Sequence, residues 1–522
     1  MPAHLPIIYV RGYAGMQSDV EETVDDPTYG FNAGSTHIRL GEEGKAIQFM
    51  FVSPFARLFR DHGYEDVIDG AVQRLPPISG NPERTIWIYR YYDPTSRTFD
   101  RPGGRRLSIE EAARGLKAFI DEIRNQIADA KRQQLKAAGK DTSSVQLCKV
   151  HLVAHSMGGL ICRCLLQKIY AVGEAESYVD KLFTYGTPHG GIHFDIAGGR
   201  LLEKLRDMVG FNDSDDFGPQ KMYSFLAPNP GDQAPDDFDP RVMPSAVFDT
   251  DRVFCIVGTN AEDYAVAAGL SRTAVGPQSD GLVQTDSAYV HGAHRAYIHR
   301  SHSGRYGMVN SEEGYQNLQR FLFGNLKVKA SLVNFALNFT ANLNPSTPDV
   351  SYFFETQVSI RGLPVLMHER VLSHYSAEAI DKKTYDDRYN SPHNALPLFT
   401  TFLLENTRSD QTMRYMMRIA LFQQNYQDGF LVFGEHLERL PLWSDYLIIE
   451  LRKPANPTSG MLYDAFFCWN SEKLEPDDPL PVESNNPNEP IRFLAPLAGT
   501  KFVGSLGANA AVRFEASVWN GT

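Results

Sequence analysis

Residues 150–171 constrain the fold of this chain more than any other stretch. An apolar run, VHLVAH, leads into Ser156, two glycines follow soon after, and helical periodicity continues to residue 171. This order predicts a buried strand, a tight turn and a helix. A serine at such a turn takes a strained backbone conformation that raises its hydroxyl above the edge of a sheet. Ala154 and Gly158, two residues to either side, are small enough for the strand and helix backbones to approach each other.

Strands and helices alternate on both sides of this turn. Apolar and β-branched runs predict strands at 6–10, 85–92, 181–185, 253–257 and 296–300. Helices are predicted from Ser53-Pro54 to Gly63, after a capping box of Ser108 and Glu111, and over 307–323. Such alternation predicts an α/β fold, in which a mostly parallel sheet carries helices on both faces.

The character of the sequence changes at Leu326. Helical periodicity fades, and short alternating runs separated by Pro, Asn and Asp predict strands at 326–339, 352–360, 446–451 and 512–519. The periodicity of 413–423 fits a helix or a strand equally well. We therefore predict an α/β domain over 1–324 and an all-β, sandwich-like domain over 325–522.

Two irregular segments interrupt the α/β pattern. Residues 16–52 are acidic and lack clear periodicity, which fits either a wall beside a pocket or a solvated loop. Residues 192–250 contain one amphipathic run, over 201–209, and then many Pro and Asp residues. We expect this second segment to be an insertion, either a lid over an apolar pocket or a cap helix packed permanently on the core.

Composition and charge argue against some classes of function. The hydrophobic fraction of 42% and the charged fraction of 22% are those of a globular protein. The formal net charge of −12 argues against binding to nucleic acid or to a strongly acidic membrane surface. The chain has no run of about 20 apolar residues that would span a membrane and no recognisable signal peptide. We expect a cytoplasmic protein, with leaderless export as the alternative.

The cysteines point to the same compartment. Their number is odd, and several fall in predicted core segments; they are Cys148, Cys162, Cys164, Cys255 and Cys468. Such a set predicts free thiols in a reducing compartment and no disulfide framework.

Four motifs together resemble one known group of enzymes. VHLVAHSMGGLICR around Ser156, with YVRGYAG before it and YGTPHGG and SDGLV after it, is similar to the α/β-hydrolase superfamily, specifically its bacterial lipase and esterase branch. The resemblance extends from residue 6 to about residue 323. Two positions depart from the usual pattern: Ala154 replaces the first glycine of the turn, and Arg11 replaces a histidine.

The resemblance implies a catalytic triad. A serine hydroxyl is a weak nucleophile until a base accepts its proton, and the base needs a carboxylate to fix its tautomer. In this fold the three residues occur in the order Ser, acid, His, which Ser156, Asp280 and His302 obey. Asp280 lies in the SDGLV motif, and Asp263 is the rival acid. His302 lies between the last predicted strand and the last predicted helix of the α/β domain, where the fold presents its base.

The same resemblance assigns the groups that would surround the substrate. The backbone N–H groups of Tyr13 and Met157 would form an oxyanion hole, in which the negative charge that develops on the acyl oxygen is stabilised. The candidate substrate-binding residues are Arg11, Gly12, His155 and His189. For His189 the competing role is to shape its own loop.

Neither a metal ion nor a cofactor is predicted. The pairs His291/His294 and His299/His302 have a loose ligand spacing, but a metal on His302 would remove the base of the triad. The related lipases often hold calcium through an Asp two residues beyond the His, and here that position is Gly304.

The expected function is hydrolysis of a small-molecule or lipid carboxylic ester through an acyl-enzyme on Ser156. The reaction class follows from the triad, whereas the choice of an ester over an amide or thioester rests on the resemblance alone. Two alternatives stay open: an acyltransferase or thioesterase that uses the same triad, and a catalytically dead scaffold that acts as a binding protein. The sequence does not indicate an oligomeric state.

Overall fold

The computed structural model describes sixteen stretches of the chain: residues 4–12, 22–40, 45–69, 72–75, 80–93, 107–192, 218–263, 276–339, 350–390, 395–404, 412–425, 441–452, 464–484, 489–497, 506–507 and 509–520. The chain divides into two compact units. The first, called the α/β unit below, comprises residues 3–295 and 299–322; the second, the β unit, comprises residues 1–2, 296–298 and 323–522. The predicted boundary near Gly324 and the limits of the predicted insertion stay predictions.

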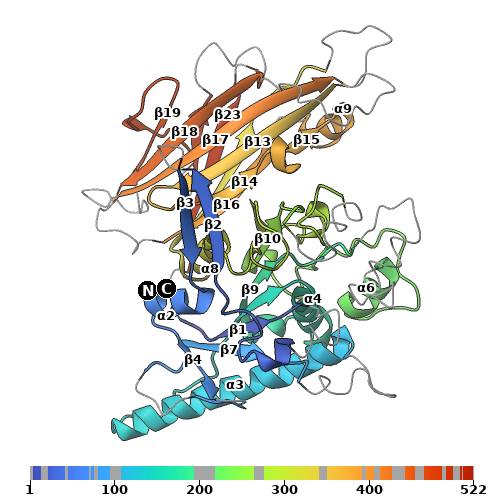
Figure 1. Cartoon of the computed structure of the whole chain (residues 1–522), viewed down its shortest axis with the longest axis vertical. Coiled ribbons are helices and arrows are strands. Elements are labelled where there is room, and N and C mark those ends of the chain that lie inside the picture. Colours follow the sequence, from blue (N-terminus) through green and yellow to red (C-terminus); the bar gives the residue numbers. More distant parts are fainter. Residues whose placement is uncertain are drawn as a thin grey trace. The chain divides into compact units, whose positions relative to one another are not determined.

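A parallel sheet forms the centre of the α/β unit (Figure 1). Within the described residues it has seven strands in the order β11-β10-β9-β8-β1-β7-β4. Parallel pairing joins each neighbouring pair from β10 to β4. The strands are β1 (Ile7–Val10), β4 (Glu65–Asp66), β7 (Thr85–Tyr89), β8 (Val150–His155), β9 (Val179–Tyr185), β10 (Val253–Gly258) and β11 (His294–Ile298). A parallel sheet with helices, followed by antiparallel sheets, is consistent with an α/β-hydrolase-like fold and a β domain.

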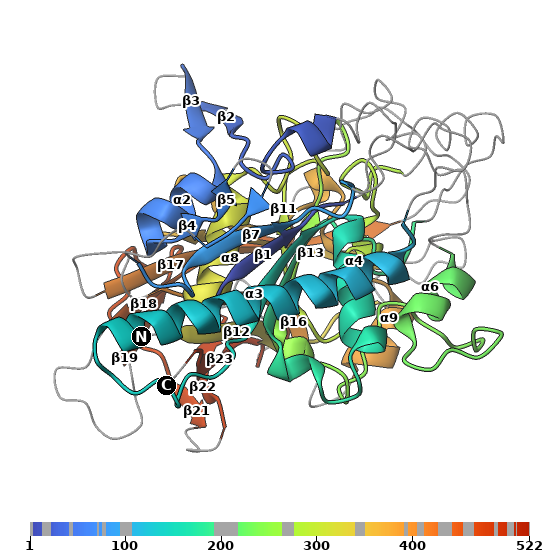
Figure 2. The same cartoon turned by 90° about the horizontal axis from the view of Figure 1, so that it is seen from below.

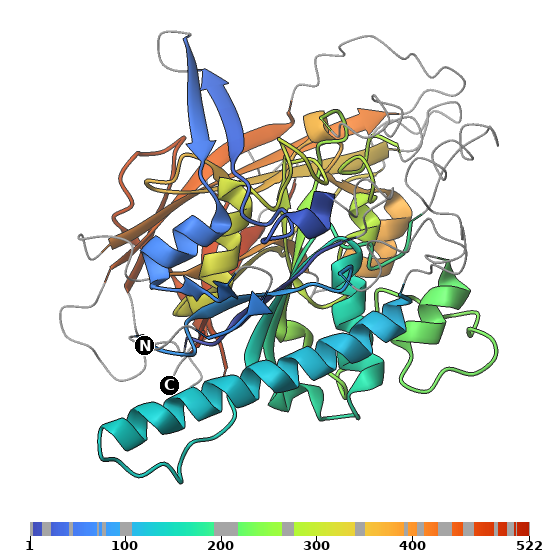
Figure 3. The same ribbon diagram turned by 60° about the horizontal axis from the view of Figure 1, so that its bottom comes forward.

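Helices cover both faces of this sheet, as Figure 2 and Figure 3 show. On one face α3 (Ile109–Ala137) packs Phe119 against Trp87 of β7, with their ring centroids 6.1 Å apart. On the other face lie α2 (Pro54–His62) and α8 (Glu312–Phe323). There Phe55 of α2 lies 4.9 Å from the Tyr9 ring, and Phe321 of α8 lies 5.4 Å from the Phe254 ring. Neither face of the central strands is therefore exposed to solvent, which explains their near-continuous apolar sequences.

Local sequence signals explain where α2 and α3 begin and end. The Ser53 side chain accepts a hydrogen bond from the N–H of Ala56, Pro54 occupies the first helical position, and Gly63 ends α2 in a left-handed conformation with φ 64°. In α3, Ser108 and Glu111 form both hydrogen bonds of the predicted capping box. These sequence predictions are confirmed.

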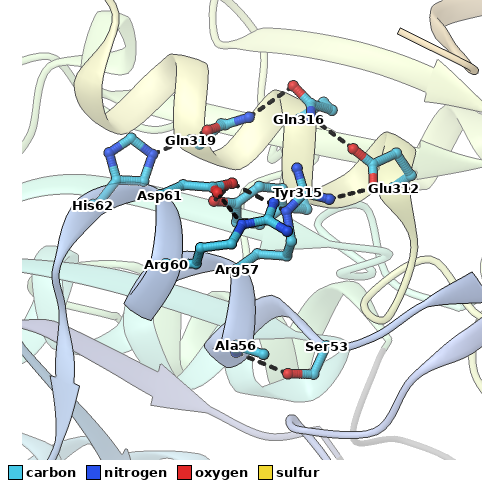
Figure 4. A network of polar contacts seen from close by, with 10 residues as sticks. All are labelled: Ser53, Ala56, Arg57, Arg60, Asp61, His62, Glu312, Tyr315, Gln316 and Gln319. Atoms are coloured by element: carbon cyan, nitrogen blue, oxygen red, sulfur yellow. Dashed lines mark hydrogen bonds and ion pairs between the residues drawn. The ribbon is translucent and has the colours of Figure 1, made fainter. Parts of the chain in front are cut away.

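Polar side chains join α2 to α8 (Figure 4). Arg57 donates to Glu312 at 2.6 Å, and the Tyr315 hydroxyl donates to Asp61 at 3.0 Å. The ring of His62 lies 3.0 Å from the side-chain oxygen of Gln319. In the chain α2 follows β1, the first strand of the sheet, and α8 follows β11, the last. These bonds therefore join early and late parts of the α/β unit's sequence.

Several predicted elements needed correction. The last helix begins at Glu312 and not at 307, and the strand predicted at 296–300 is β11, His294–Ile298. The helix after Ser156 is α4 (Met157–Cys164) and continues as a π-helical turn, η1 (Leu165–Ile169). The acidic segment 16–52 contains an antiparallel hairpin, β2 (Ser35–Leu40) with β3 (Ala46–Phe51), which its aperiodic sequence did not predict. A second small hairpin pairs β5 (Ile68–Asp69) with β6 (Val72–Gln73).

The strand order reverses between β1 and β8. From β1 the chain builds β4 and β7 to one side, and it then crosses over to build β8, β9, β10 and β11 on the other. Ligands bind open α/β sheets at the carboxyl ends of the strands where the order reverses in this way. Here those ends belong to β1 and β8, and Val10, the last residue of β1, pairs with Ala154 near the end of β8. Arg11 and Gly12 are therefore neighbours of Ser156.

The β unit is built from two antiparallel sheets, as the alternating sequence predicted. One has the order β16-β12-β23-β22-β21 and the other β14-β13-β17-β18-β19-β20, with β15 beside β13. The strands are β12 (Leu326–Val333), β13 (Val350–Ile360), β14 (Leu366–Arg370), β15 (Glu378–Ile380), β16 (Ala395–Leu403), β17 (Thr412–Asn425), β18 (Trp443–Arg452), β19 (Asp464–Trp469), β20 (Asp478–Pro479), β21 (Val482–Ser484), β22 (Ile491–Pro496) and β23 (Ala511–Val518).

The pairing of strands in the β unit settles one sequence question. The ambiguous run 413–423 is a strand, β17, because it pairs with β13 and β18. Along the last strand, β23, Val512 and Phe514 are buried, at 0% and 4% exposed, whereas Val518 at the strand end is 59% exposed. Among the helices that the structure describes, none has the length and apolar character needed to cross a bilayer.

Candidate active site

Ser156 lies at the sharp turn between β8 and α4 that the sequence predicts. Its φ of 54° and ψ of −131° are rare for a residue with a side chain. Such a conformation costs about 1–3 kcal/mol and persists only where neighbouring groups enforce it. One of these groups is the carbonyl of Tyr185 in β9, which accepts the Ser156 N–H at 2.9 Å. Thr187 adds a second bond, from its hydroxyl to the Ser156 carbonyl at 2.8 Å.

Glycines make this turn possible by leaving out side chains. A Cβ atom on Gly158 would lie 2.3 Å from the carbonyl oxygen of Val10, and one on Gly159 would lie 2.1 Å from the Thr187 hydroxyl. A Cβ on Gly12 would lie 2.4 Å from the Ser156 Cβ. These distances are far below van der Waals contact, so a larger residue at any of the three positions would displace the backbone or the side chain that it meets.

A continuous line of hydrogen bonds joins the three predicted triad residues. His302 Nε2 lies 2.9 Å from Ser156 Oγ, and His302 Nδ1 lies 2.8 Å from Asp280 Oδ2. Their exposed fractions are 7% for Ser156, 3% for His302 and 1% for Asp280. Ser156 and Asp280 are 124 positions apart in the chain, and Asp280 and His302 are 22 apart. The fold thus brings together three residues that are distant in the sequence.

The Asp280 carboxylate is held by backbone groups as well as by His302. Its Oδ1 atom accepts the N–H groups of Leu282 at 3.0 Å and Val283 at 2.7 Å, which leaves Oδ2 directed at the imidazole. Two glycines provide its space: a Cβ on Gly258 would lie 2.7 Å from the Asp280 Cβ, and one on Gly186 would lie 2.8 Å from Oδ2. The acid is therefore a buried group with a fixed direction.

The backbone of His302 is also fixed at two points. Its N–H donates to the Asp280 carbonyl at 2.9 Å, and its own carbonyl lies 2.9 Å from Nε2 of His155. The two imidazole rings lie with their centroids 4.8 Å apart. Burial lowers the pKa of His155 well below its ordinary value, so His155 is neutral at pH 7 and can donate its Nε2–H to that carbonyl. Its predicted role in substrate binding stays a prediction.

The predicted loop after β1 is described as far as Gly12. The Arg11 guanidinium donates to the carbonyl of Tyr29, in the turn that precedes the β2–β3 hairpin. The Gly12 carbonyl accepts hydrogen bonds from the hydroxyls of Tyr91 and Tyr92, both at 3.1 Å. Sequence reasoning missed both tyrosines, because nothing in the run RYYDP distinguishes them from the apolar strand before them.

Of the two predicted oxyanion donors, Tyr13 lies outside the described residues. Met157 is the first residue of α4, and the first N–H groups of an α-helix have no carbonyl partner within the helix. Its N–H therefore belongs to the set that can receive an anion at a helix N-terminus.

His189 is enclosed by the loop that carries it. It is 0% exposed, and its Nε2 lies 3.1 Å from the Thr184 hydroxyl and 3.6 Å from the Cys255 sulfur. Burial lowers its pKa well below the ordinary value. These contacts describe a buried, neutral histidine within the YGTPHGG loop; both of its predicted roles, in substrate binding and in shaping its loop, stay predictions.

The rival acid, Asp263, and the other histidines between residues 291 and 302 contact residues outside the triad. Asp263 accepts a hydrogen bond from the side chain of Asn260 at 2.7 Å. His291 lies 2.9 Å from Asp239, His294 lies 3.0 Å from Asp251, and His299 Nδ1 lies 3.3 Å from the Thr259 hydroxyl. Within the described part of the chain no group of three or more His, Cys, Asp or Glu residues could hold a metal ion. All five cysteines are free thiols.

A buried arginine holds residues 218–250, the larger described part of the predicted insertion. Arg163 of α4 is 0% exposed and donates to the carbonyls of Pro240 at 2.7 Å and Val242 at 3.0 Å. Burial lowers its pKa to about 10, which still leaves it charged at pH 7. In the same segment α6 (Pro219–Leu226) buries Met222 and Phe225. The amphipathic run 201–209, on which the lid prediction rests, lies outside the described residues.

Comparison with known proteins gives only slight likenesses. Neither a family model nor a curated protein matches the chain. A metagenomic carboxyl esterase is 14% identical over 57% of this chain and 65% of its own, with a TM-score of 0.26. The phospholipase PlaB from Legionella pneumophila is 12% identical over 81% of this chain and 90% of its own, with a TM-score of 0.29. This chain covers 47% of the chain matched in the Tle4–Tli4 complex, at a TM-score of 0.19. The functional assignment therefore depends on the site itself.

Proposed function

We propose that this protein is a serine hydrolase that cleaves carboxylic esters through an acyl-enzyme on Ser156. The observation that carries the proposal is the line of hydrogen bonds from Ser156 Oγ through His302 to Asp280. Nucleophile, base and orienting acid are each within hydrogen-bond reach, which is the geometry that activates a serine hydroxyl. The strained turn at Ser156 and its place at the switch in strand order support the same assignment.

In the acylation step, Ser156 Oγ attacks the ester carbonyl and His302 Nε2 accepts its proton. Asp280 holds the Nδ1–H of His302, so that Nε2 is the free acceptor, and it stabilises the imidazolium that forms. The negative acyl oxygen is received by the N–H of Met157 and, as the sequence motif predicts, by that of Tyr13. The imidazolium then protonates the departing alkoxide.

Deacylation repeats these roles with a new nucleophile. His302 removes a proton from a water molecule, the hydroxide attacks the acyl carbon, and Ser156 leaves with the proton returned by His302. The products are a carboxylic acid and an alcohol. If an alcohol or thiol takes the place of water, the same site becomes an acyltransferase, so analysis of the products with an added alcohol distinguishes the two activities.

Labelling with a fluorophosphonate probe and turnover of nitrophenyl esters test this function. We expect wild type to be labelled at Ser156, and Ser156→Ala to lose the label and at least about 10⁴-fold in kcat. Ser143→Ala is the matched control, because Ser143 is exposed and its hydroxyl donates to the Asp141 carboxylate; it should keep full activity. Full activity of Ser156→Ala would refute the proposal.

Esters of graded chain length then test whether the substrate has a lipid-like acyl group. Equal activity on all chain lengths would contradict that substrate class.

A further inference from the structure

The end of β9 holds both backbone polar groups of the nucleophile. The carbonyl of Tyr185 accepts the Ser156 N–H at 2.9 Å, and the hydroxyl of Thr187 donates to the Ser156 carbonyl at 2.8 Å. Between these two residues Gly186 leaves room for the acid, since a Cβ there would lie 2.8 Å from Asp280 Oδ2. Three consecutive residues thus relate the position of the nucleophile to that of the acid.

Thr187 is a rigid support for its bond to the nucleophile. It is 0% exposed, and its β-branched side chain has little freedom of rotation about χ1. It precedes Pro188, which restricts the backbone of the residue before it. Its side chain also packs against α4 at Gly159, where a Cβ would lie 2.1 Å from the Thr187 hydroxyl oxygen and 2.6 Å from Cγ2. Packing and hydrogen bonding therefore hold the hydroxyl in one place.

The Ser156 carbonyl accepts hydrogen bonds from two different elements. The N–H of Gly159, at 3.0 Å, belongs to α4, which begins directly after Ser156. The Thr187 hydroxyl belongs to the loop after β9. One carbonyl oxygen can accept both bonds, because it has two lone pairs. The first bond fixes the carbonyl relative to α4 alone, whereas the second fixes it relative to the loop that lies against Asp280.

The opposite side of the same peptide carries the N–H of Met157. This peptide is trans, since the described residues include no cis peptide bond, and in a trans peptide the carbonyl and the following N–H point in opposite directions. Met157 is the first residue of α4, so its N–H has no acceptor within the helix. A Ser156 carbonyl held toward Thr187 therefore directs the Met157 N–H away from that loop, out of the amino end of α4.

We propose that Thr187 is a positioning residue, which holds the Ser156 carbonyl and so aims the Met157 N–H at the acyl oxygen. Its hydroxyl proton is engaged by the Ser156 carbonyl, so Thr187 acts through the peptide and not on the substrate. The inference rests on the proposed acyl transfer at Ser156, since an oxyanion forms only in that chemistry. An aimed donor stabilises the negative oxygen of the transition state more than the neutral ester carbonyl, so the effect belongs to kcat.

The test compares Thr187→Val, Thr187→Ala and Thr187→Ser with wild type in the full-length protein. Val and Ala both lack the hydroxyl, so either one serves if the other does not fold. We expect each to lose about 10-fold in kcat, less than the removal of a whole oxyanion donor would cost, with KM for a nitrophenyl ester changed less than about threefold. The inhibition constant of phenylboronic acid, whose adduct with serine mimics the tetrahedral intermediate, should rise in parallel. Thr187→Ser keeps the hydroxyl and should stay within about threefold of wild type in both.

Thr85→Val is the matched control for stability. Thr85 is the first residue of β7, is 3% exposed, and its hydroxyl also donates to a backbone carbonyl, that of Pro82 at 3.1 Å. The variant should lower the melting temperature about as much as Thr187→Val and leave kcat within about twofold.

The positioning role is overturned if the variants without the hydroxyl keep their kcat and boronate affinity. It is also overturned if Thr187→Ser or Thr85→Val loses as much of both as they do. Each of these outcomes leaves the hydrolase assignment intact, because that assignment depends on the loss of label and activity in Ser156→Ala.

Discussion

At the scale of single residues, the base of the proposed triad is fixed from three directions. Asp280 holds its Nδ1, His155 donates to its carbonyl, and Ser156 lies at its Nε2. His302 would become positively charged during the reaction. Because burial lowers the pKa of His155 and keeps it neutral, the neighbouring imidazole does not oppose that charge. A residue that supports the base in this way must be close to it and uncharged, and His155, the last residue of β8, meets both conditions.

The acid provides the sharpest residue-scale prediction. Asp280→Asn keeps the shape of the side chain but removes the charge that fixes the His302 tautomer, so we expect kcat to fall by about 10³- to 10⁴-fold with little change in KM. Asp263→Asn is the control, because Asp263 bonds to Asn260, and it should stay active. Kinetics of the two purified variants on one nitrophenyl ester make the measurement. A larger loss from Asp263→Asn would transfer the role to that carboxylate.

At the scale of elements, the turn between β8 and α4 depends on the close approach of two backbones. The first turn of α4 passes so near the end of β1 that Gly158 has backbone oxygen atoms of Val10 and Arg11 where a Cβ would be, at 2.3 and 2.6 Å. Backbone carbonyls cannot move aside as a side chain can. The position of the nucleophile therefore depends on the absence of one methyl group.

Gly158→Ala tests this packing. We expect it to destabilise the α/β unit by about 3 kcal/mol or more, or to prevent folding, because β1 and α4 must separate. Gly231→Ala is the matched control, since the nearest atom to its Cβ would be the Tyr223 hydroxyl at 3.9 Å; its effect should stay within about 0.5 kcal/mol. Thermal unfolding of the two variants is the measurement. Equal melting temperatures would show that the backbones can separate at little cost.

At the scale of the whole molecule, buried neutral histidines couple stability to pH. His151 of β8 is 1% exposed, and burial lowers its pKa from 6.5 to about 3. Between these two values the unfolded chain binds a proton that the folded chain does not. The free energy of unfolding is therefore unaffected by this group above pH 6.5 and decreases as the pH falls from 6.5 toward 3. His155 and His189, whose pKa values burial also lowers, act in the same direction.

The expected contribution of His151 at pH 5 is a loss of about 2 kcal/mol relative to pH 7. His151→Leu should remove that part of the pH dependence, because leucine has similar size and does not titrate. Urea unfolding at pH 7 and pH 5, followed for wild type and variant, gives the difference directly. His291→Leu, at a position whose side chain is 44% exposed, is the control and should not weaken the dependence. An identical pH dependence in wild type and His151→Leu would contradict the burial argument.

The sequence by itself predicted what depends on neighbours along the chain. The strand into Ser156, the caps at Ser53 and Ser108 and the end of α2 at Gly63 are each set within a few residues, and the structure has them where the sequence placed them. The candidate triad of Ser156, Asp280 and His302 could also be predicted from the sequence, because recognisable motifs surround Ser156 and Asp280. The start of α8 could not, because Met308 and Val309 are apolar but precede the helix in a turn.

Only the tertiary structure decided what depends on residues far apart in the chain. The sequence could not tell that the hydroxyls of Tyr91 and Tyr92 meet Gly12, or that Arg163 bonds to the carbonyl of Pro240. The strand nature of β17 likewise came from its neighbours β13 and β18, since its own periodicity fits either structure. Hydrogen bonds between distant segments leave no periodic signal, because a carbonyl of any residue type can accept them.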